Sequence, residues 1–125
     1  MTKQAYRVGK EVRWPDYEIE VVVFATSPSG AMEIAFKKAA YVMGAETLSD
    51  LRAKRESWAD QYAEIERIPI RAFLENGWTW DCYACDEAIS IHDVGGIGEH
   101  DQPLCERCAA RKGITRPEWA KAATE

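Results

Sequence analysis

Apolar and polar residues alternate over Tyr17–Phe24, and this period of two predicts a β-strand. The last residues of this stretch are apolar on both faces, so we expect that end of the strand to be buried on both sides. Ala5–Trp14 is predicted to form the first arm of a hairpin, with the turn at Trp14-Pro15-Asp16.

The spacing of apolar residues then changes from two to the period of a helix. Ser27 suits the N-cap position and Pro28 the first helical position, since proline needs no backbone donor there. We expect the helix to run to about Met43 and to stop at Gly44. Residues 5–44 therefore predict a β-β-α arrangement with the helix packed on the sheet.

A second helix is predicted over Leu48–Ile65, because an amphipathic stripe recurs at helical spacing. The stripe consists of Leu48, Leu51, Arg55, Trp58, Tyr62 and Ile65. Ile68-Pro69-Ile70 follows, either as a short extended segment or with Pro69 opening a short helix that ends at Asn76-Gly77.

These patterns predict an α+β protein in three parts. Residues 1–77 form a β-β-α-α module, residues 78–113 a metal-stabilised finger, and residues 114–125 a polar C-terminal tail. Gly77 is the expected boundary between the first two parts. Trp78 and Trp80 alternate with polar residues, as in a strand that leads into the first cysteine.

All four cysteines lie in the expected finger, as two C-x-x-C pairs: Cys82 with Cys85, and Cys105 with Cys108. The 19 residues between the pairs fall within the spacing that is typical of zinc sites. Two residues between cysteines let the chain curl so that both sulfur atoms reach one ion at about 2.3 Å. Each pair can then supply half of a tetrahedron around one Zn²⁺ ion.

The connection between the pairs predicts further structure. Ala88–His92 is expected to be a strand, Val94–Gly98 a flexible turn, Gln102–Leu104 the return to Cys105, and Ala109–Gly113 a short helix. Residues 80–113 thus resemble a treble-clef zinc finger, with a zinc ribbon as the close alternative. The resemblance implies a zinc-binding fold without a specific activity, and only the four cysteines transfer as functional positions.

Four thiolates would close the coordination shell and leave no position for water, so we expect a structural zinc and not a catalytic one. His92 and His100 lie in the connecting loop and are alternative ligands or neighbours of the ion, although such histidines are more often simply exposed loop residues. Two disulfides would be the rival interpretation in a secreted protein. The start of the chain has no apolar signal region and no apolar run is long enough for a membrane helix, so we expect a soluble, cytoplasmic protein.

The net charge is −5, and residues 78–125 carry five Lys/Arg against nine Asp/Glu. Nucleic-acid binding normally depends on a basic surface that neutralises phosphate, so the acidic finger counts against it. The best candidates for a local contact with phosphate or an acidic partner are the cations that cluster around the predicted finger helix: Arg107, Arg111, Lys112 and Arg116. The alternative for these cations is a favourable interaction with the helix dipole.

Trp78, Trp80 and Trp119 are further candidates for partner contact, because tryptophan is enriched at binding hot spots. Each has a structural alternative, in which it packs against the body of the protein. The sequence has no nucleophile elbow, no H-E-x-x-H and no phosphate-binding glycine loop, so we expect a protein that is not an enzyme.

Two main hypotheses follow. The first is a zinc-stabilised adaptor or inhibitor that acts through protein–protein contact, and the second is a nucleic-acid-binding accessory protein; an enzyme without a recognised motif is the weakest alternative. The short, acidic make-up with an appended four-cysteine finger resembles small proteins encoded by phages or mobile elements. That resemblance would imply an inhibitor directed at a host or defence complex, for example of the anti-CRISPR kind.

Overall fold

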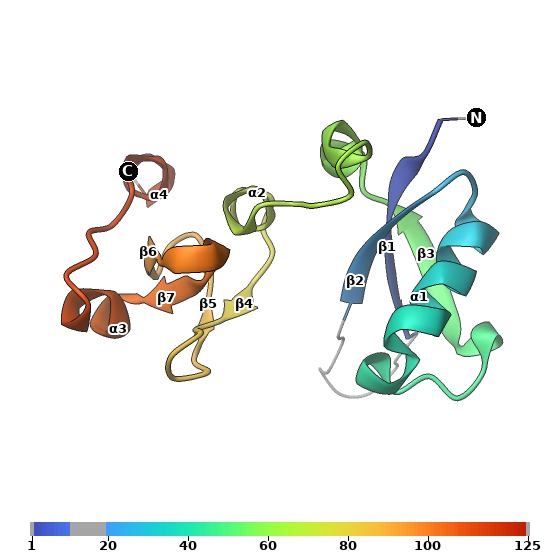
Figure 1. The fold of residues 1–125 in the computed structure, drawn as a ribbon, viewed down its shortest axis with the longest axis horizontal. Coiled ribbons are helices and arrows are strands. Elements are labelled where there is room, and N and C mark those ends of the chain that lie inside the picture. Colours follow the sequence, from blue (N-terminus) through green and yellow to red (C-terminus); the bar gives the residue numbers. More distant parts are fainter. Residues whose placement is uncertain (1, 11–19, 125) are drawn as a thin grey trace. The chain divides into compact units, whose positions relative to one another are not determined.

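The computed structural model describes residues 2–10 and 20–124 of the chain, which divides into two compact units (Figure 1). The units are Met1–Arg67 and Ile68–Glu125. The division lies ahead of Gly77, the boundary expected from the sequence, so the helix before Gly77 belongs to the C-terminal unit. Both units combine helices with small antiparallel sheets, which confirms the α+β class.

The N-terminal unit is built on a three-stranded antiparallel sheet with the order β2-β1-β3. The strands are β1 (Gln4–Lys10), β2 (Glu20–Ala25) and β3 (Leu51–Arg55). In the central strand, Tyr6 and Val8 share one face and are almost completely buried. The predicted pairing of the first two strands is confirmed, whereas the turn at Trp14-Pro15-Asp16 and the start of the second strand at Tyr17 lie outside the described residues.

Helix α1 (Pro28–Met43) packs on the sheet, as predicted (Figure 1). The Ser27 side chain accepts a hydrogen bond from the Gly30 N–H at 3.1 Å and so caps the helix. Gly44 ends it with a φ of 72°, a left-handed conformation that glycine adopts without a steric penalty. Ala31, Ala35 and Met43 are the buried residues of the helix, and they pack into the core around Tyr6 and Val8.

The predicted helix over Leu48–Ile65 is wrong. The chain forms a 3₁₀ turn, η1 (Leu48–Asp50), then β3, then a second 3₁₀ turn, η2 (Ser57–Tyr62). Strand β1 has a second edge, and β3 fills it with Leu51 and Ala53 on the same face as Val8. Since the backbone hydrogen bonds and burial gained at this edge are tertiary, they override a helical pattern that is local.

The C-terminal unit begins with α2 (Ile70–Glu75), which starts after Pro69 and ends at Asn76-Gly77, confirming one of the two alternatives. Two short antiparallel pairs follow: β4 (Trp80–Asp81) with β5 (Ala88–Ile89), and β6 (Val94–Ile97) with β7 (Pro103–Cys105). A 3₁₀ turn, η3 (Glu99–Asp101), joins β6 to β7. The last helices are α3 (Glu106–Arg111) and α4 (Glu118–Thr124).

Two expectations about this unit need correction. Val94–Gly98 was expected to be a flexible turn, but Val94–Ile97 is strand β6, and its glycines are buried because other chain segments pack against them. Residues 114–125 were expected to be a polar tail, but they contain α4, whose Ala120 is completely buried. The aspartate of η3 is also tied into the unit, since Asp101 Oδ2 accepts a hydrogen bond of 2.8 Å from the Ile70 N–H at the start of α2.

Candidate metal centre

The four cysteines occupy two backbone turns of the C-terminal unit. Cys82 and Cys85 lie in the turn that joins β4 to β5, which the Cys82 N–H closes by donating to the Glu87 carbonyl at 2.8 Å. Cys105 is the last residue of β7 and the N-cap of α3, and Cys108 lies in the first turn of that helix. The Tyr83 N–H donates to the Pro103 carbonyl at 2.8 Å and so holds the first turn against β7.

This arrangement brings the four sulfur atoms together. All four Sγ atoms lie within 4.8 Å of one another, and those of Cys85 and Cys105 are 3.7 Å apart. A tetrahedron with metal–sulfur bonds of about 2.3 Å has edges of about 3.8 Å. A disulfide would need about 2.05 Å, so this spacing is that of ligands around one ion and not of a sulfur–sulfur bond. The predicted convergence of the four cysteines is confirmed.

Backbone donors favour the thiolate form at one corner of the centre. Cys82 is completely buried, which opposes ionisation, but N–H groups of Cys105, Cys85 and Ala84 outweigh burial and lower its pKa to about 6. One of these bonds is the 3.3 Å contact from the Cys105 N–H to Cys82 Sγ. The Cys108 N–H similarly donates to Cys105 Sγ at 3.4 Å.

The Cys108 thiol shows the effect of placing four sulfur atoms close together, because its ionisation is disfavoured. The hydrogen bond to Cys105, together with burial and the other sulfur atoms, raises the pKa of Cys108 to about 12. Four negative charges at this spacing repel one another strongly unless a cation lies between them. The donor set therefore suits a metal ion that prefers sulfur, and four protein ligands leave none of the usual tetrahedral positions for substrate or water.

The two histidines of the connecting loop are placed differently from the cysteines. The group of potential ligands within 4.8 Å, among the described residues, consists of the four cysteines. His92 is exposed, and its backbone carbonyl accepts a hydrogen bond from Arg116. His100 is exposed in the 3₁₀ turn η3 with a φ of 55°.

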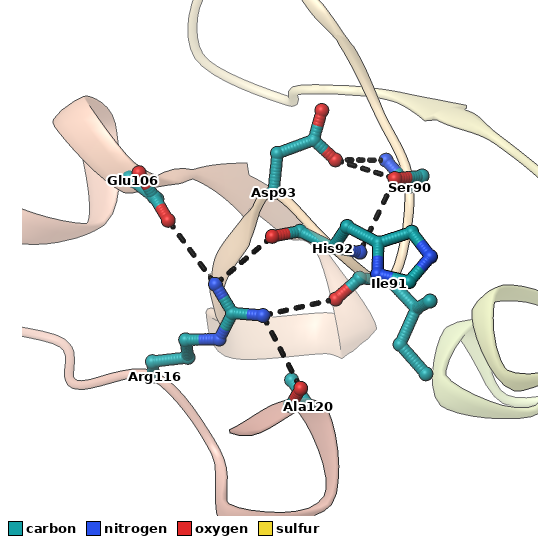
Figure 2. A network of polar contacts seen from close by, with 7 residues as sticks. All are labelled: Ser90, Ile91, His92, Asp93, Glu106, Arg116 and Ala120. Atoms are coloured by element: carbon teal, nitrogen blue, oxygen red, sulfur yellow. Dashed lines mark hydrogen bonds and ion pairs between the residues drawn. The ribbon is translucent and has the colours of Figure 1, made fainter. Parts of the chain in front are cut away.

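Of the four candidate cations, Arg116 is bound within its own unit (Figure 2). Its Nη1 donates to the His92 carbonyl at 3.0 Å and to Glu106 Oε1 at 3.1 Å. Its Nη2 donates to the carbonyls of Ile91 and Ala120, each at 3.2 Å. The side chain is 20% exposed, so Arg116 clamps the loop after β5, helix α3 and helix α4 together.

The other three cations are exposed residues of α3 or its C-cap. Arg107 lies 3.9 Å from Glu87 and beside Cys85, and the hydrogen bond to the Cys85 sulfur raises the pKa of the guanidinium. Arg111 lies in the last turn of the helix and Lys112 at its C-cap, where a cation interacts favourably with the helix dipole.

The candidate tryptophans contact other side chains of the C-terminal unit. The Trp78 and Trp80 rings lie 5.0 and 4.9 Å from the ring of Phe73, a buried residue of α2. The guanidinium of Arg71 stacks over the Trp119 ring at 5.3 Å. Trp80 keeps 36% of its surface exposed, and Tyr83 in the first cysteine turn keeps 61%.

Sequence reasoning missed a cleft of about 260 Å³ beside the metal centre. Its polar lining comes from Glu87, Asp93, Glu106 and Arg107, and its apolar lining includes Ala88 and Ile89. Three carboxylates and the Arg107 guanidinium line the cleft, and Arg116 also pairs with Glu106, so the charges at the cleft remain net negative. The acidic residues belong to no motif, and they come from three places: the residue before β5, the turn after β5 and the start of α3.

Compared with known proteins, the chain matches no family model, no curated protein sequence and no solved structure. Helices with the length and apolar character needed to cross a membrane do not occur in the part of the chain that the structure describes. The functional argument therefore depends on the site itself.

Proposed function

We propose that the C-terminal unit is a structural zinc module that presents a surface for a protein partner. The convergence of four cysteine sulfur atoms within 4.8 Å carries this proposal. An all-thiolate tetrahedral set is typical of structural zinc, and its closed shell disfavours a metal-bound water that could act in catalysis. The role of the ion is then to hold the surface in shape, and the protein is not an enzyme.

The order of elements supports a treble-clef-like arrangement over a zinc ribbon. One cysteine pair lies in a turn between strands, and a hairpin of β6 and β7 leads to the second pair. That second pair begins a helix, since Cys105 caps α3 and Cys108 lies in its first turn. In a zinc ribbon, the second pair would be expected in a turn between strands.

The acidic cleft is the surface that we assign to the partner. Glu87, Asp93 and Glu106 line it, and four thiolates with one Zn²⁺ would add two negative charges at its wall. A potential of this sign attracts lysine and arginine side chains and repels phosphate. The partner is therefore a protein that offers a basic segment, and an adaptor or inhibitor of a protein complex would work in this way.

The second candidate function is nucleic-acid binding through α3, and the exposure of Arg111 and Lys112 favours it. Against it, the Arg116 guanidinium binds Glu106 and backbone carbonyls, and Arg107 lies close to Glu87. Two exposed cations next to an acidic cleft are a weak basis for phosphate contacts, which usually number several per site.

The test first measures metal content by native mass spectrometry, with one zinc per chain expected. Proteins captured by the immobilised chain from a cell extract are then compared with those captured by Glu87→Lys and by Glu33→Lys, a matched charge reversal on the exposed face of α1. The proposal expects Glu87→Lys, still zinc-loaded, to lose specific partners that Glu33→Lys retains.

Binding of DNA and RNA at low salt is measured in parallel. Affinity that falls with salt and disappears in Arg111→Glu would support the second candidate and contradict the first. If Glu87→Lys and Glu33→Lys captured the same proteins, the acidic cleft would not be the partner site. If the chain folded without metal, it would not be a structural zinc module.

A further inference from the structure

The three-stranded sheet of the N-terminal unit has two edges, and the hydrogen-bond ladder shows which groups point outward from each. The Glu56 N–H donates to the Ala5 carbonyl at 3.0 Å, just past the Tyr6–Arg55 pair of β1 and β3. In an antiparallel ladder, alternate residues direct both backbone groups to the same neighbour. Ala5, Arg7 and Gly9 therefore face β3 with their backbone groups.

The intervening residues of β1 must then bond to β2. Tyr6 pairs with Val23, and Val8 pairs with Val21, so these valines direct their backbone groups inward. The backbone groups of Glu20, Val22 and Phe24 point to the outer edge. Among the described residues, no hydrogen bond reaches the outward backbone groups of Val22 or Phe24.

The two edges differ in their side chains. The outer edge of β3 carries Arg52, Lys54 and Arg55, and the Arg52 guanidinium donates to the Leu51 carbonyl at 2.8 Å. Cations on an edge strand, and a side chain that occupies an outward carbonyl, are features that prevent strands from pairing between molecules. The β3 edge is therefore protected.

The β2 edge lacks this protection. Its sequence is Glu-Val-Val-Val-Phe-Ala, with one charged side chain at the end and no proline. Val21 and Val22 are only partly buried in the unit. Figure 1 shows β2 at the edge of the sheet. A β-branched, apolar edge strand whose outward groups at Val22 and Phe24 bond to none of the described residues is the type of edge that accepts a further strand.

We infer that β2 pairs with β2 of a second copy of this chain, antiparallel and in a register centred on Val22. In this register, Val22 faces Val22 of the second copy, and Glu20 faces Phe24, with outward backbone groups meeting outward backbone groups. Val21 and Val23 fall opposite each other between these pairs, so the contact is apolar and no like charges meet. The second copy extends the sheet from three strands to six.

The occupant is a second copy and not a basic or acidic peptide, because the edge is apolar and self-complementary. A two-fold axis through Val22 places the outward N–H and carbonyl of Val22 in one copy against those of Val22 in the other. This inference does not use the metal centre or its proposed function.

Sedimentation of the zinc-loaded chain over micromolar to millimolar concentration tests the inference, with a monomer–dimer equilibrium expected. Val22→Pro removes only an outward N–H and leaves the β1 ladder complete, so it should weaken the dimer by about tenfold or more through the loss of two symmetric hydrogen bonds. Ala53→Pro removes an outward N–H from the β3 edge and should leave the dissociation constant of the dimer unchanged.

Val22→Lys is a second variant that needs no proline in the strand, and it places two cations opposite each other at the centre of the interface. In NMR spectra of mixed isotope-labelled and unlabelled wild-type chains, an intermolecular nuclear Overhauser effect between the α-protons of Val21 and Val23 should report the register. A wild type that stays monomeric, a dimer that survives both Val22 variants, or a dimer lost in Ala53→Pro would overturn the inference.

Discussion

The Arg55 guanidinium binds the Asp60 carboxylate through two parallel hydrogen bonds, 2.8 Å from Nη1 to Oδ1 and 2.6 Å from Nη2 to Oδ2. Asp60 Oδ1 also accepts a bond of 2.7 Å from the Ala5 N–H. One carboxylate thus connects η2 with the central strand and with the end of β3. The Arg55 guanidinium beside Asp60 lowers the pKa of that carboxyl to about 2, although burial works in the opposite direction.

This pair predicts a stability term that depends on pH. The Asp60 pKa is lower in the folded chain than the usual value of about 3.9, so its contribution is complete above pH ~4 and is lost as the pH falls toward 2. Both side chains are about one-third exposed, so solvent screening reduces the effect, and we expect Asp60→Asn to cost about 1 kcal/mol at pH 7. Hydrogen exchange of β1 amides measures this cost.

The Ala5 amide resonance gives an independent reading of the same titration, because the Ala5 N–H donates a hydrogen bond to Asp60 Oδ1. Its chemical shift should titrate near pH 2 in the wild type. In Arg55→Gln the midpoint should rise toward the ordinary aspartate value. An unchanged midpoint would show that Arg55 does not stabilise the Asp60 carboxylate.

Removal of the metal should unfold one unit and spare the other. The C-terminal unit has short strands and helices around its four sulfur atoms, whereas the N-terminal unit has its own core around Val8 and Leu51. Zinc binding contributes on the order of 10 kcal/mol to such modules, which is comparable to the whole stability of a small domain. In a chelator and a reductant, amide signals of residues 68–124 should collapse while those of β1 and α1 persist.

The matched control is Cys85→Ser, which removes the most exposed of the four ligands without adding chelator. It should show the same selective loss of structure. A C-terminal unit that keeps dispersed amide signals without metal would mean that its side-chain packing is sufficient for folding.

The convergence of the four cysteines was predictable from the sequence because its constraint is chemical and local. Two residues between cysteines fix how both sulfur atoms can reach one ion, whatever the rest of the fold does. The cap at Ser27 and the stop at Gly44 were predictable for the same reason, since each depends on a few adjacent residues.

The helix predicted over Leu48–Ile65 is wrong because the structure of this segment depends on residues that are distant in the sequence. Of the six residues of its amphipathic stripe, Leu51 is the one that is buried, while Leu48 and Ile65 are exposed. Strand β3 forms because β1 has an edge to fill, and that edge belongs to a segment more than 40 residues earlier. No local period can show that a distant strand lacks a partner.

A glycine-rich sequence predicts a turn at β6, because glycine content does not reveal which atoms pack against it. A Cβ on Gly95 would lie 2.5 Å from the Cys105 carbonyl oxygen and from Glu106 Cα, both backbone atoms at the start of α3. A Cβ on Gly96 would instead clash with Cγ2 of the Ile114 side chain and would lie 3.3 Å from the Thr115 carbonyl oxygen. Both glycines therefore allow close packing, but the severe clash is with backbone atoms at Gly95 and with a side chain at Gly96.

This difference predicts opposite responses to a second mutation. Gly95→Ala should displace the Cys105 backbone and weaken zinc binding by at least about tenfold in a competition with a coloured chelator, because ligand geometry shifts. Gly96→Ala should also be destabilising, but Ile114→Ala in the same chain should restore much of the loss. Ile114→Ala should not rescue Gly95→Ala, and rescue of both would contradict the packing argument.

Arg116 was expected at a partner surface, and its conformation predicts a structural effect instead. Its guanidinium donates hydrogen bonds to three backbone carbonyls and to Glu106 (Figure 2). No local sequence pattern indicates these bonds, because the acceptors lie up to 25 residues away. Arg116→Ala leaves these acceptors without their donor, so we expect a loss of about 2–3 kcal/mol in urea unfolding of the zinc-loaded chain.

Arg116→Lys should recover only part of this stability, because an ammonium group cannot span acceptors that the planar guanidinium reaches from two nitrogen atoms. Arg111→Ala is the matched control on an exposed arginine of α3 and should change stability by less than about 0.5 kcal/mol. If Arg116→Ala were as mild as Arg111→Ala, the clamp between the loop after β5, α3 and α4 would contribute little, and α4 would be held by other contacts, such as the burial of Ala120 and the Arg71–Trp119 contact.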